Sequence, residues 1–166
     1  HLASIISTNP SKQNREMQQL VKKNFGISMI IPAEMQASKK VGNFIWISNN
    51  ASSGMKNLIL MKVKREERRV KANSDAFPAQ EKQQIDSMLR TNMPGETDSM
   101  YMTIPVLSEK GLWEMKSDAM GGPYAMRRIR LRKTGDEIII IGFVYAPEMK
   151  KKILIKQLEA AISTIK

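Results

Sequence analysis

Short apolar runs bounded by glycine, proline, asparagine and serine dominate the hydrophobic pattern of this chain. Such runs are typical of β-strands, in which successive side chains point to opposite faces of a sheet. The pattern predicts seven strands, at residues 27–32, 43–48, 57–63, 101–106, 111–117, 123–133 and 136–146. Most of the connections between them are short enough for hairpins, which favours a mainly antiparallel sheet.

Three other stretches have apolar residues three and four positions apart, the spacing of an amphipathic helix. The predicted helices run from Pro10, with Asn9 as the N-cap, to Gly26, from Pro78 to Pro94, and from residue 148 to residue 165. We expect an α+β fold in which all three helices pack on one face of the sheet. Because each half of the chain runs from a helix into strands, an internal repeat of two halves remains an alternative.

The length of 166 residues fits a single α+β domain spanning residues 1–166, with residues 1–12 as a flexible lead-in. No run of about 18 apolar residues is present to cross a membrane as a helix. The first residues lack an initiator methionine and the layout of a secretion signal. We therefore expect the chain to be a fragment or a processed product.

The segment from residue 123 to residue 146 predicts a hairpin with Thr134 and Gly135 as its turn. This turn would place Arg132 opposite Glu137, and Ile129 opposite Ile140. Directly opposed residues share a face. One face then carries Ile129, Leu131, Ile138 and Ile140, and the other carries Arg128, Arg130 and Arg132 beside Ile139, Ile141 and Phe143.

The net charge of +11 makes an anionic partner a reasonable expectation. Arginines at Arg128, Arg130 and Arg132 would be spaced about 6.6–6.8 Å apart on one strand face, close to the charge spacing of many polyanions. The competing interpretation is that their methylene groups cover neighbouring isoleucines while the guanidinium groups stay in water. A third interpretation is that another domain or a partner chain covers this face.

Three lysines, Lys150, Lys151 and Lys152, occupy the predicted first turn of the last helix, where the helix dipole disfavours positive charge. Gly121, Gly122 and Pro123 lie at the same end of the predicted hairpin, but a strand rather than a helix follows them, so they are interpreted as a turn. Together with the three arginines, the lysines are the candidate ligand-binding residues, for phosphate, a lipid headgroup or an acidic glycan.

The residue types needed for several common catalytic sites are missing. The chain has no cysteine and a single histidine, His1, which removes Cys-His and Ser-His-Asp arrangements and multi-histidine metal sites. We assign no catalytic residue, no metal ligand and no cofactor. Glu114 and Asp118 near Trp113 form the best carboxylate pair, for which a solvated or turn-capping role is favoured. A Ser-Lys dyad stays open.

Three strings near the C-terminus resemble one known family: GLWEMKSDAMGGPY at 111–124, GFVYAP at 142–147 and KQLEAAISTIK at 156–166. They resemble the C-terminal part of an uncharacterised domain-of-unknown-function family of Bacteroides-type bacteria, whose members look like longer envelope lipoproteins. The residues that carry the resemblance most closely are Asp118, Gly121, Gly122, Pro123, Gly142, Tyr145, Ala146 and Pro147. The resemblance implies that this chain is the C-terminal part of a longer lipoprotein, held in the cell envelope by a lipid anchor on an N-terminal cysteine outside this chain. It implies no substrate or catalytic residue.

These observations favour a non-catalytic envelope domain that contacts its own missing N-terminal half, a partner protein or an envelope polymer. The first alternative is a binder of anionic ligands that uses the arginines and lysines named above. The second is a hydrolase with an unrecognised carboxylate or Ser-Lys site. Nucleic acid is disfavoured as a partner, because the basic segment lacks the interleaved aromatic residues on which bases stack.

Overall fold

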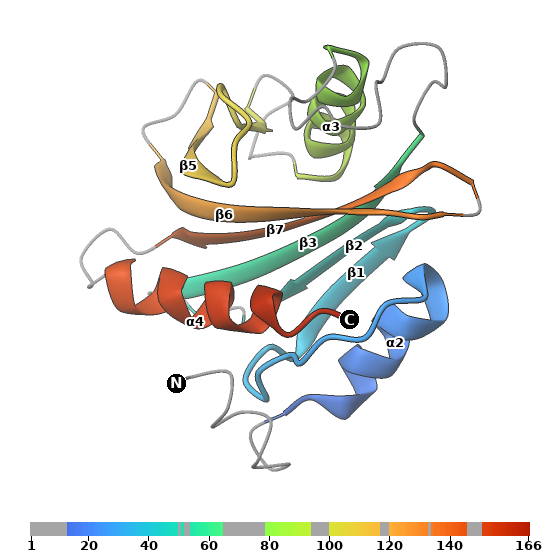
Figure 1. Cartoon of the computed structure of the whole chain (residues 1–166). Coiled ribbons are helices and arrows are strands. Elements are labelled where there is room, and N and C mark those ends of the chain that lie inside the picture. The colour runs from blue at the N-terminus through green and yellow to red at the C-terminus, as the bar shows by residue number, and fades with distance from the viewer. Residues whose placement is uncertain are drawn as a thin grey trace.

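The structure is a computed structural model that describes residues 13–49, 51, 54–64, 79–93, 100–116, 120–132, 134–145 and 151–166. Within these residues, one antiparallel sheet has the strand order β1-β2-β3-β7-β6-β5-β4 (Figure 1). The strands are β1 (Ala37–Val41), β2 (Phe44–Ser48), β3 (Met55–Val63), β4 (Met102–Thr103), β5 (Lys110–Met115), β6 (Gly121–Arg130) and β7 (Glu137–Tyr145). The helices are α2 (Arg15–Phe25), α3 (Ala79–Asn92) and α4 (Lys151–Ser163). The expected α+β class with an antiparallel sheet is confirmed.

Two meanders meet at the centre of the sheet. Strands β1 to β3 follow one another, the chain then passes through α3 to β4 at the far edge, and strands β4 to β7 return until β7 pairs with β3. Residues 138–141 are four buried isoleucines in the middle of β7. A continuous apolar run of this kind is expected in a strand that is covered on both faces.

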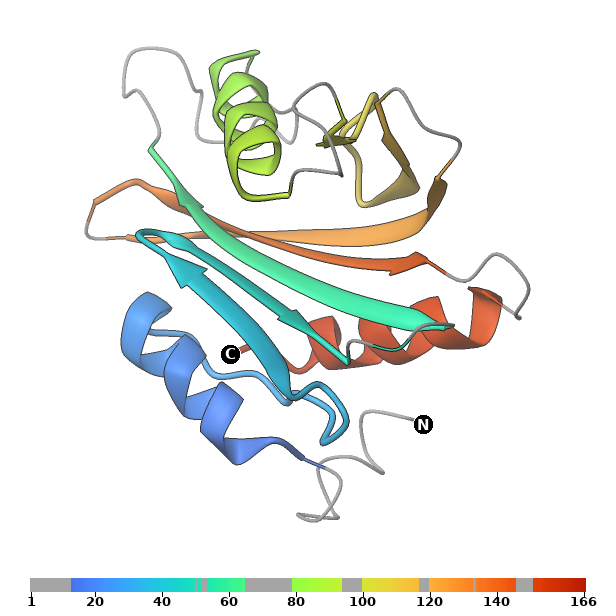
Figure 2. The ribbon, with the colours of Figure 1, turned by 180° about the vertical axis from the view of Figure 1, so that it is seen from behind.

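The helices cover both faces of this curled sheet (Figures 1 and 2). On one face Ile138 and Ile140 join a core cluster that includes residues of α2 and α4. On the other face Ile139 and Ile141 join a second cluster that includes Ile85 and Leu89 of α3. The expectation of three helices on one face is therefore wrong. Strand β7 is apolar on both faces, so helices must shield both faces from water.

The placement of the helices also gives no support to the internal repeat. The neighbouring antiparallel strands β3 and β7 would be related by a two-fold axis perpendicular to the sheet. Such an axis would put the equivalent helices α2 and α3 on the same face, whereas they belong to different core clusters.

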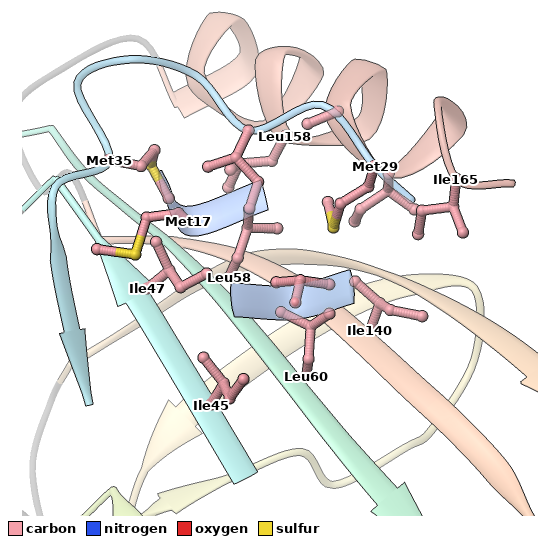
Figure 3. Close-up of a cluster of buried hydrophobic side chains, with 14 of the residues drawn as sticks. Met17, Met29, Met35, Ile45, Ile47, Leu58, Leu60, Ile140, Leu158 and Ile165 are labelled. Atoms are coloured by element: carbon pink, nitrogen blue, oxygen red, sulfur yellow. The ribbon is translucent and has the colours of Figure 1, made fainter. Parts of the chain in front are cut away.

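Flexible methionines fill much of the core on the face of α2 and α4. Figure 3 shows Met17, Met29 and Met35 among the branched side chains of this cluster, and all three are buried. Met17 comes from α2, while Met29 and Met35 come from the segment between α2 and β1. Unbranched thioether side chains fit irregular gaps, which accounts for this use of methionine.

Helix α2 begins later than the sequence predicts. Its N-cap is Asn14, whose side-chain Oδ1 accepts a hydrogen bond from the backbone N–H of Met17 at 3.1 Å. The predicted start at Asn9 and Pro10, like the whole lead-in 1–12, lies outside the described residues. The predicted end is confirmed, since Gly26 is the C-cap with φ 72° and its N–H donates to the carbonyl oxygen of Lys22.

The predicted strand at 27–32 is wrong, although its alternation of buried side chains is right. Ile27, Met29 and Ile31 are buried, as the apolar pattern requires. The backbone N–H of Ile31 donates to the side-chain oxygen of Gln18, and that of Ile30 donates to the hydroxyl of Thr164. Side chains of the flanking helix and the C-terminal residues thus satisfy this backbone in place of a neighbouring strand.

The two edges of the sheet depart most from the prediction. Strand β1 was not predicted, because Ser38 to Val41 are exposed and leave no apolar alternation to recognise. Strand β4 contains only two residues of the predicted 101–106. The strands predicted at 43–48, 57–63, 111–117, 123–133 and 136–146 correspond to β2, β3, β5, β6 and β7 with small changes of boundary.

The predicted β6–β7 hairpin is present with a register two residues away from the expected one. Arg130, rather than Arg132, lies opposite Glu137, and Ile129 lies opposite Ile138. The connection is wider than a two-residue turn, because the N–H of Leu131 donates to the carbonyl oxygen of Asp136. A shift of two residues leaves every side chain on its predicted face, because strand side chains alternate with a period of two.

Candidate functional site

Two of the three predicted arginines, Arg128 and Arg130, share a face of β6, and Arg132 lies beyond the strand. Arg128 lies half-buried, with its guanidinium 3.9 Å from the buried carboxylate of Glu137. Arg130 is the exposed last residue of β6, and Arg132 lies beyond the strand in the turn. The isoleucines beside them belong to the core under α3. Anion binding by these three residues remains a prediction, now with less geometric support.

Arg127 points to the other face and has a structural partner. Its Nη1 donates to the backbone carbonyl oxygens of Ile162 at 3.2 Å and Ile165 at 3.4 Å, at the end of α4. The carbonyl groups at a helix C-terminus lack partners within the helix and carry the negative end of its dipole. Arg127 therefore links the C-terminal end of α4 to strand β6 of the sheet through hydrogen bonds.

The lysine cluster is only partly described. Lys151 and Lys152 are the first residues of α4, with Lys152 exposed, and Lys150 lies outside the described residues. Within the described residues, no hydrogen bond or ion pair joins Lys151 or Lys152 to the arginines of β6. A ligand held by the lysines remains a prediction separate from the arginines.

The glycines that carry the family resemblance have packing roles. A Cβ on Gly122 would lie 2.3 Å from the carbonyl oxygen of Val144 and 3.2 Å from the indole nitrogen of Trp113. A Cβ on Gly142 would lie 3.0 Å from the Cβ of Leu158, where α4 packs on β7. These contacts need glycine for close approach of backbone and side chains.

The other residues of the resemblance are placed as follows. Pro123 lies opposite Leu112 in the β5–β6 pair, Gly121 lies opposite Glu114, and Tyr145 is the half-buried end of β7. Asp118, Ala146 and Pro147 lie outside the described residues. The strings that resemble the family thus mark close packing between β5, β6, β7 and α4.

The predicted carboxylate site is not assembled by the described residues. Trp113 is buried, with its indole Nε1 donating to the carbonyl oxygen of Val144 at 3.0 Å, while Glu114 is the next residue on β5 and is exposed. Successive strand residues point to opposite faces, so the two side chains do not face each other. Asp118, the other member of the pair, lies outside the described residues.

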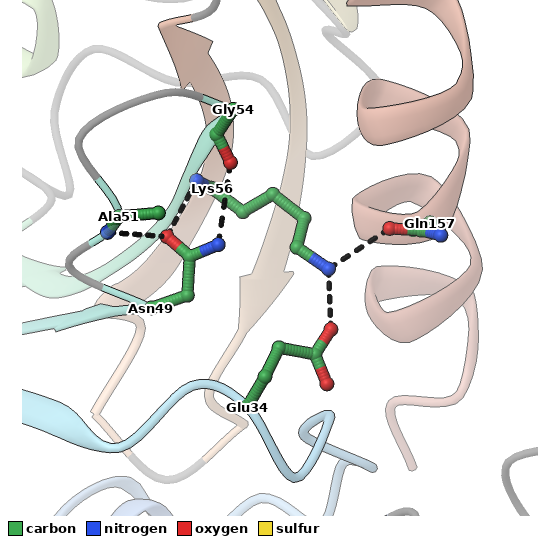
Figure 4. A network of polar contacts seen from close by, with 6 residues as sticks. All are labelled: Glu34, Asn49, Ala51, Gly54, Lys56 and Gln157. Carbon is green, nitrogen blue, oxygen red and sulfur yellow. Dashed lines mark hydrogen bonds and ion pairs between the residues drawn. The ribbon is translucent and has the colours of Figure 1, made fainter.

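A buried lysine that sequence reasoning missed ties three segments together (Figure 4). Lys56 of β3 is only 5% exposed, and its Nζ contacts the carboxylate of Glu34 and donates to the side-chain oxygen of Gln157 on α4 at 2.9 Å. Burial tends to raise the pKa of Glu34, but hydrogen bonds and the charge of Lys56 outweigh it, so the pKa is lowered from its ordinary value. The ammonium group of Lys56 thus links β3 to α4 and to the segment before β1, which is a structural role.

A pocket between α3 and β4 holds the second missed cluster. It has a volume of about 370 Å³ and is lined by Lys82, Asp86, Ser87, Arg90, Tyr101, Thr103, Ile104 and Pro105. The guanidinium carbon of Arg90 lies 4.7 Å from the centre of the Tyr101 ring, and the Nζ of Lys116 lies 5.3 Å from it. We call this the Tyr101 pocket. Its residues are far apart in the sequence, so no local pattern could have indicated it.

Fold and sites together define an α+β protein built on one curled antiparallel sheet with a helix-lined core on each face. The chain matches the family model described as Domain of unknown function (DUF4837) over residues 14–164, and it belongs to this family. The comparison with curated proteins finds no match. The comparison with solved structures finds none either.

The described part of the chain contains no helix that is long and apolar enough to span a membrane. The same residues contain no group of three or more histidine, cysteine, aspartate or glutamate side chains placed to hold a metal ion.

Proposed function

We propose that this protein is a non-catalytic domain of the bacterial cell envelope, held there by a lipid anchor on a longer chain, and that it acts by binding a partner polypeptide. The envelope location comes from the resemblance of its C-terminal strings to envelope lipoproteins. The partner polypeptide is either the remainder of its own longer chain or another envelope protein. One observation supports the binding role above the others, namely the open edge of β1.

Strand β1 is one edge of the sheet formed by the described residues. It pairs with β2 on one side, from Ala37 opposite Ser48 to Val41 opposite Phe44, and no strand of the described residues pairs with its other side. Residues 38–41 are exposed. An exposed edge of this kind accepts an extended peptide as an additional strand, with main-chain hydrogen bonds providing affinity.

The charge of the edge favours an acidic partner segment. Lys39 and Lys40 are neighbours on β1, so they point to opposite faces, and both are exposed. An added strand would pass between two lysines in a protein of net charge +11. Acidic side chains on both faces of the partner strand would complement them. The opposite edge is less suitable, because β4 contains only two residues.

Site-specific photocrosslinking in the native host tests this proposal. A photoreactive residue replaces Val41, which is 48% exposed at the end of β1, and a control replaces the exposed Lys23 of α2. We expect one defined adduct from position 41 and none from position 23. The adduct should map to an extended acidic segment, and β1 amides should then exchange more slowly with solvent in the complex. Equal crosslinking from both positions would refute an edge-specific partner.

The location is tested separately by cell fractionation of the full natural chain. We expect it in the membrane fraction, and we expect it to become soluble when the lipid-bearing cysteine proposed outside these residues is replaced by serine. A protein that stays soluble in the cytoplasm would refute the location without affecting the crosslinking result.

A further inference from the structure

The Tyr101 pocket brings together positive charge from two segments of the chain. Lys82, Asp86 and Arg90 are four residues apart, so they form one stripe along α3. Tyr101 and Thr103 line the opposite wall from the β4 region, and Lys116 reaches the Tyr101 ring from the end of β5. This contact between helix and strand edge is independent of β1 and of the arginines of β6.

The charges in the pocket are not balanced. The Nζ of Lys82 is paired with the carboxylate of Asp86 at 2.8 Å. No carboxylate of the described residues pairs with Arg90 or with Lys116. Among the described residues, Lys82, Arg90 and Lys116 with the carboxylate of Asp86 leave an excess of two positive charges in and beside the pocket.

Arg90 and Lys116 each have the Tyr101 ring as a partner. A cation over an exposed tyrosine ring gains about 0.5–1 kcal/mol. Arg90 at 4.7 Å and Lys116 at 5.3 Å from the same ring centre would both be stabilised by an anion bound beside the ring. The pocket therefore holds positive charge that its own residues do not neutralise.

The hydrogen-bonding groups of the pocket suit oxygen atoms. Arg90 and Lys116 supply charged N–H donors, and the hydroxyl groups of Tyr101 and of the exposed Ser87 supply neutral ones. The hydroxyl of Thr103 already donates to the carbonyl oxygen of Glu114 at 3.1 Å. Four donors from separate side chains can contact three terminal oxygens of one group better than the two oxygens of a carboxylate.

We propose that the Tyr101 pocket binds a phosphate monoester. Such a group carries about −1.5 to −2 charges at neutral pH and three acceptor oxygens, which match the charge excess and the donors of the pocket. The shared chemistry is the terminal phosphate, and it can come from a soluble sugar or glycerol phosphate or from a phosphomonoester headgroup on a lipid.

Tyr101 provides a reporter inside the site. The hydrogen bond from Lys116 lowers the pKa of its phenol, aided by the charges of Lys116 and Arg90 and opposed by that of Asp86. A bound dianion would engage the same two cations. Binding should therefore raise the pKa of Tyr101, which an ultraviolet titration detects as the difference between the protein and its Tyr101→Phe variant.

The direct test is a titration with glycerol 3-phosphate followed by backbone amide shifts, with acetate as the matched carboxylate probe. We expect shifts confined to residues of the pocket, and affinity for glycerol 3-phosphate reduced roughly fivefold by Arg90→Gln or Lys116→Gln, since exposed charge pairs are worth up to about 1 kcal/mol. Lys23→Gln removes one positive charge from an exposed residue of α2, outside the pocket, and should leave the affinity unchanged. Circular dichroism and thermal unfolding establish that each variant is folded.

Flotation with phosphatidylcholine vesicles, with and without phosphatidic acid, distinguishes the two sources of phosphate. Binding to phosphatidic acid vesicles that Arg90→Gln weakens supports a lipid headgroup, and glycerol 3-phosphate binding without flotation supports a soluble ligand. The proposal is overturned if acetate binds as tightly as glycerol 3-phosphate, if Lys23→Gln weakens binding as much as Arg90→Gln, or if neither phosphate probe shifts the pocket amides. None of these results depends on whether β1 binds a partner.

Discussion

The indole nitrogen of Trp113 donates a hydrogen bond to the backbone carbonyl oxygen of Val144 at 3.0 Å, although their strands β5 and β7 are not neighbours. The bond passes over β6 at Gly122, the residue opposite Trp113 in the β5–β6 pair. Trp113 also packs edge-on against Phe143, with ring centres 5.2 Å apart. Because Gly122 has no side chain, the two strands that flank β6 can contact each other across it.

Replacing Gly122 with alanine should destabilise the protein by about 2–3 kcal/mol, because the new Cβ forces apart a packed contact and breaks a buried hydrogen bond. The Cβ would lie 2.3 Å from the Val144 oxygen. Urea unfolding followed by tryptophan fluorescence measures the change. The matched control is Gly135→Ala, where φ is 76° but no heavy atom lies within 4 Å of the new Cβ, so only backbone strain of about 1 kcal/mol is expected. A larger loss at Gly135 would contradict the close-approach role.

The pair formed by Lys56 and Glu34 should respond unequally to removal of its two members. Glu34→Gln leaves the buried ammonium of Lys56 without its carboxylate and should cost about 1–2 kcal/mol, less than a fully buried pair because half of the Glu34 side chain is exposed. Lys56→Met removes the buried charge and fills its place, so a change under about 1 kcal/mol is expected. Urea unfolding of both variants and of the double variant checks this order. Equal losses would mean that the ammonium is not effectively buried.

The same pair should make stability depend on pH in the acid range. The pKa of Glu34 is lower in the folded protein than its ordinary value of 4.5, so the unfolded chain takes up this proton first as the pH falls. The stabilisation is therefore complete above about pH 4.5 and is lost as the pH drops through the folded pKa. Unfolding free energies of the protein and of Glu34→Gln, measured over this range, should converge at low pH. A constant difference would show that Glu34 does not titrate with a lowered pKa.

The central strands could be predicted from the sequence because their own residues form apolar runs or alternate between apolar and polar side chains. The isoleucines at 138–141 indicated a strand, and the alternation of Ile129 and Arg128 placed each residue on its correct face even though the register was two residues away. The edge strand β1 has no such pattern, because exposed residues such as Lys39 leave no period to detect. The segment at 27–31 alternates like a strand, but its backbone is bonded by Gln18 and Thr164, which sequence spacing cannot indicate.

The candidate sites also divide into features with a local sequence pattern and features that depend on tertiary contacts. The arginines of β6 were visible as a run, whereas the buried carboxylate of Glu137 beside Arg128 and the helix end beside Arg127 depend on tertiary packing. The Tyr101 pocket joins Arg90 to Lys116 across a long stretch of chain. Lys56 offered a weak signal, since it shares a strand face with the core residues Leu58 and Leu60, and an inward lysine needs a partner.

Arg127 should matter more for stability than the exposed Arg130 of the same strand. Arg127→Met keeps an apolar stem of similar length but removes the donor that contacts the carbonyl oxygens of Ile162 and Ile165, so a loss of about 1 kcal/mol is expected. Arg130→Met is the control, because Arg130 is exposed and forms no ion pair or side-chain hydrogen bond with another described residue, and it should change stability by less than about 0.5 kcal/mol. Hydrogen exchange locates the effect: amides in the last turn of α4 should exchange faster in Arg127→Met alone. Equal losses of stability in both variants would contradict this prediction. They would mean that the arginines act through overall charge and that the hydrogen bonds of Arg127 to the end of α4 add no stability of their own.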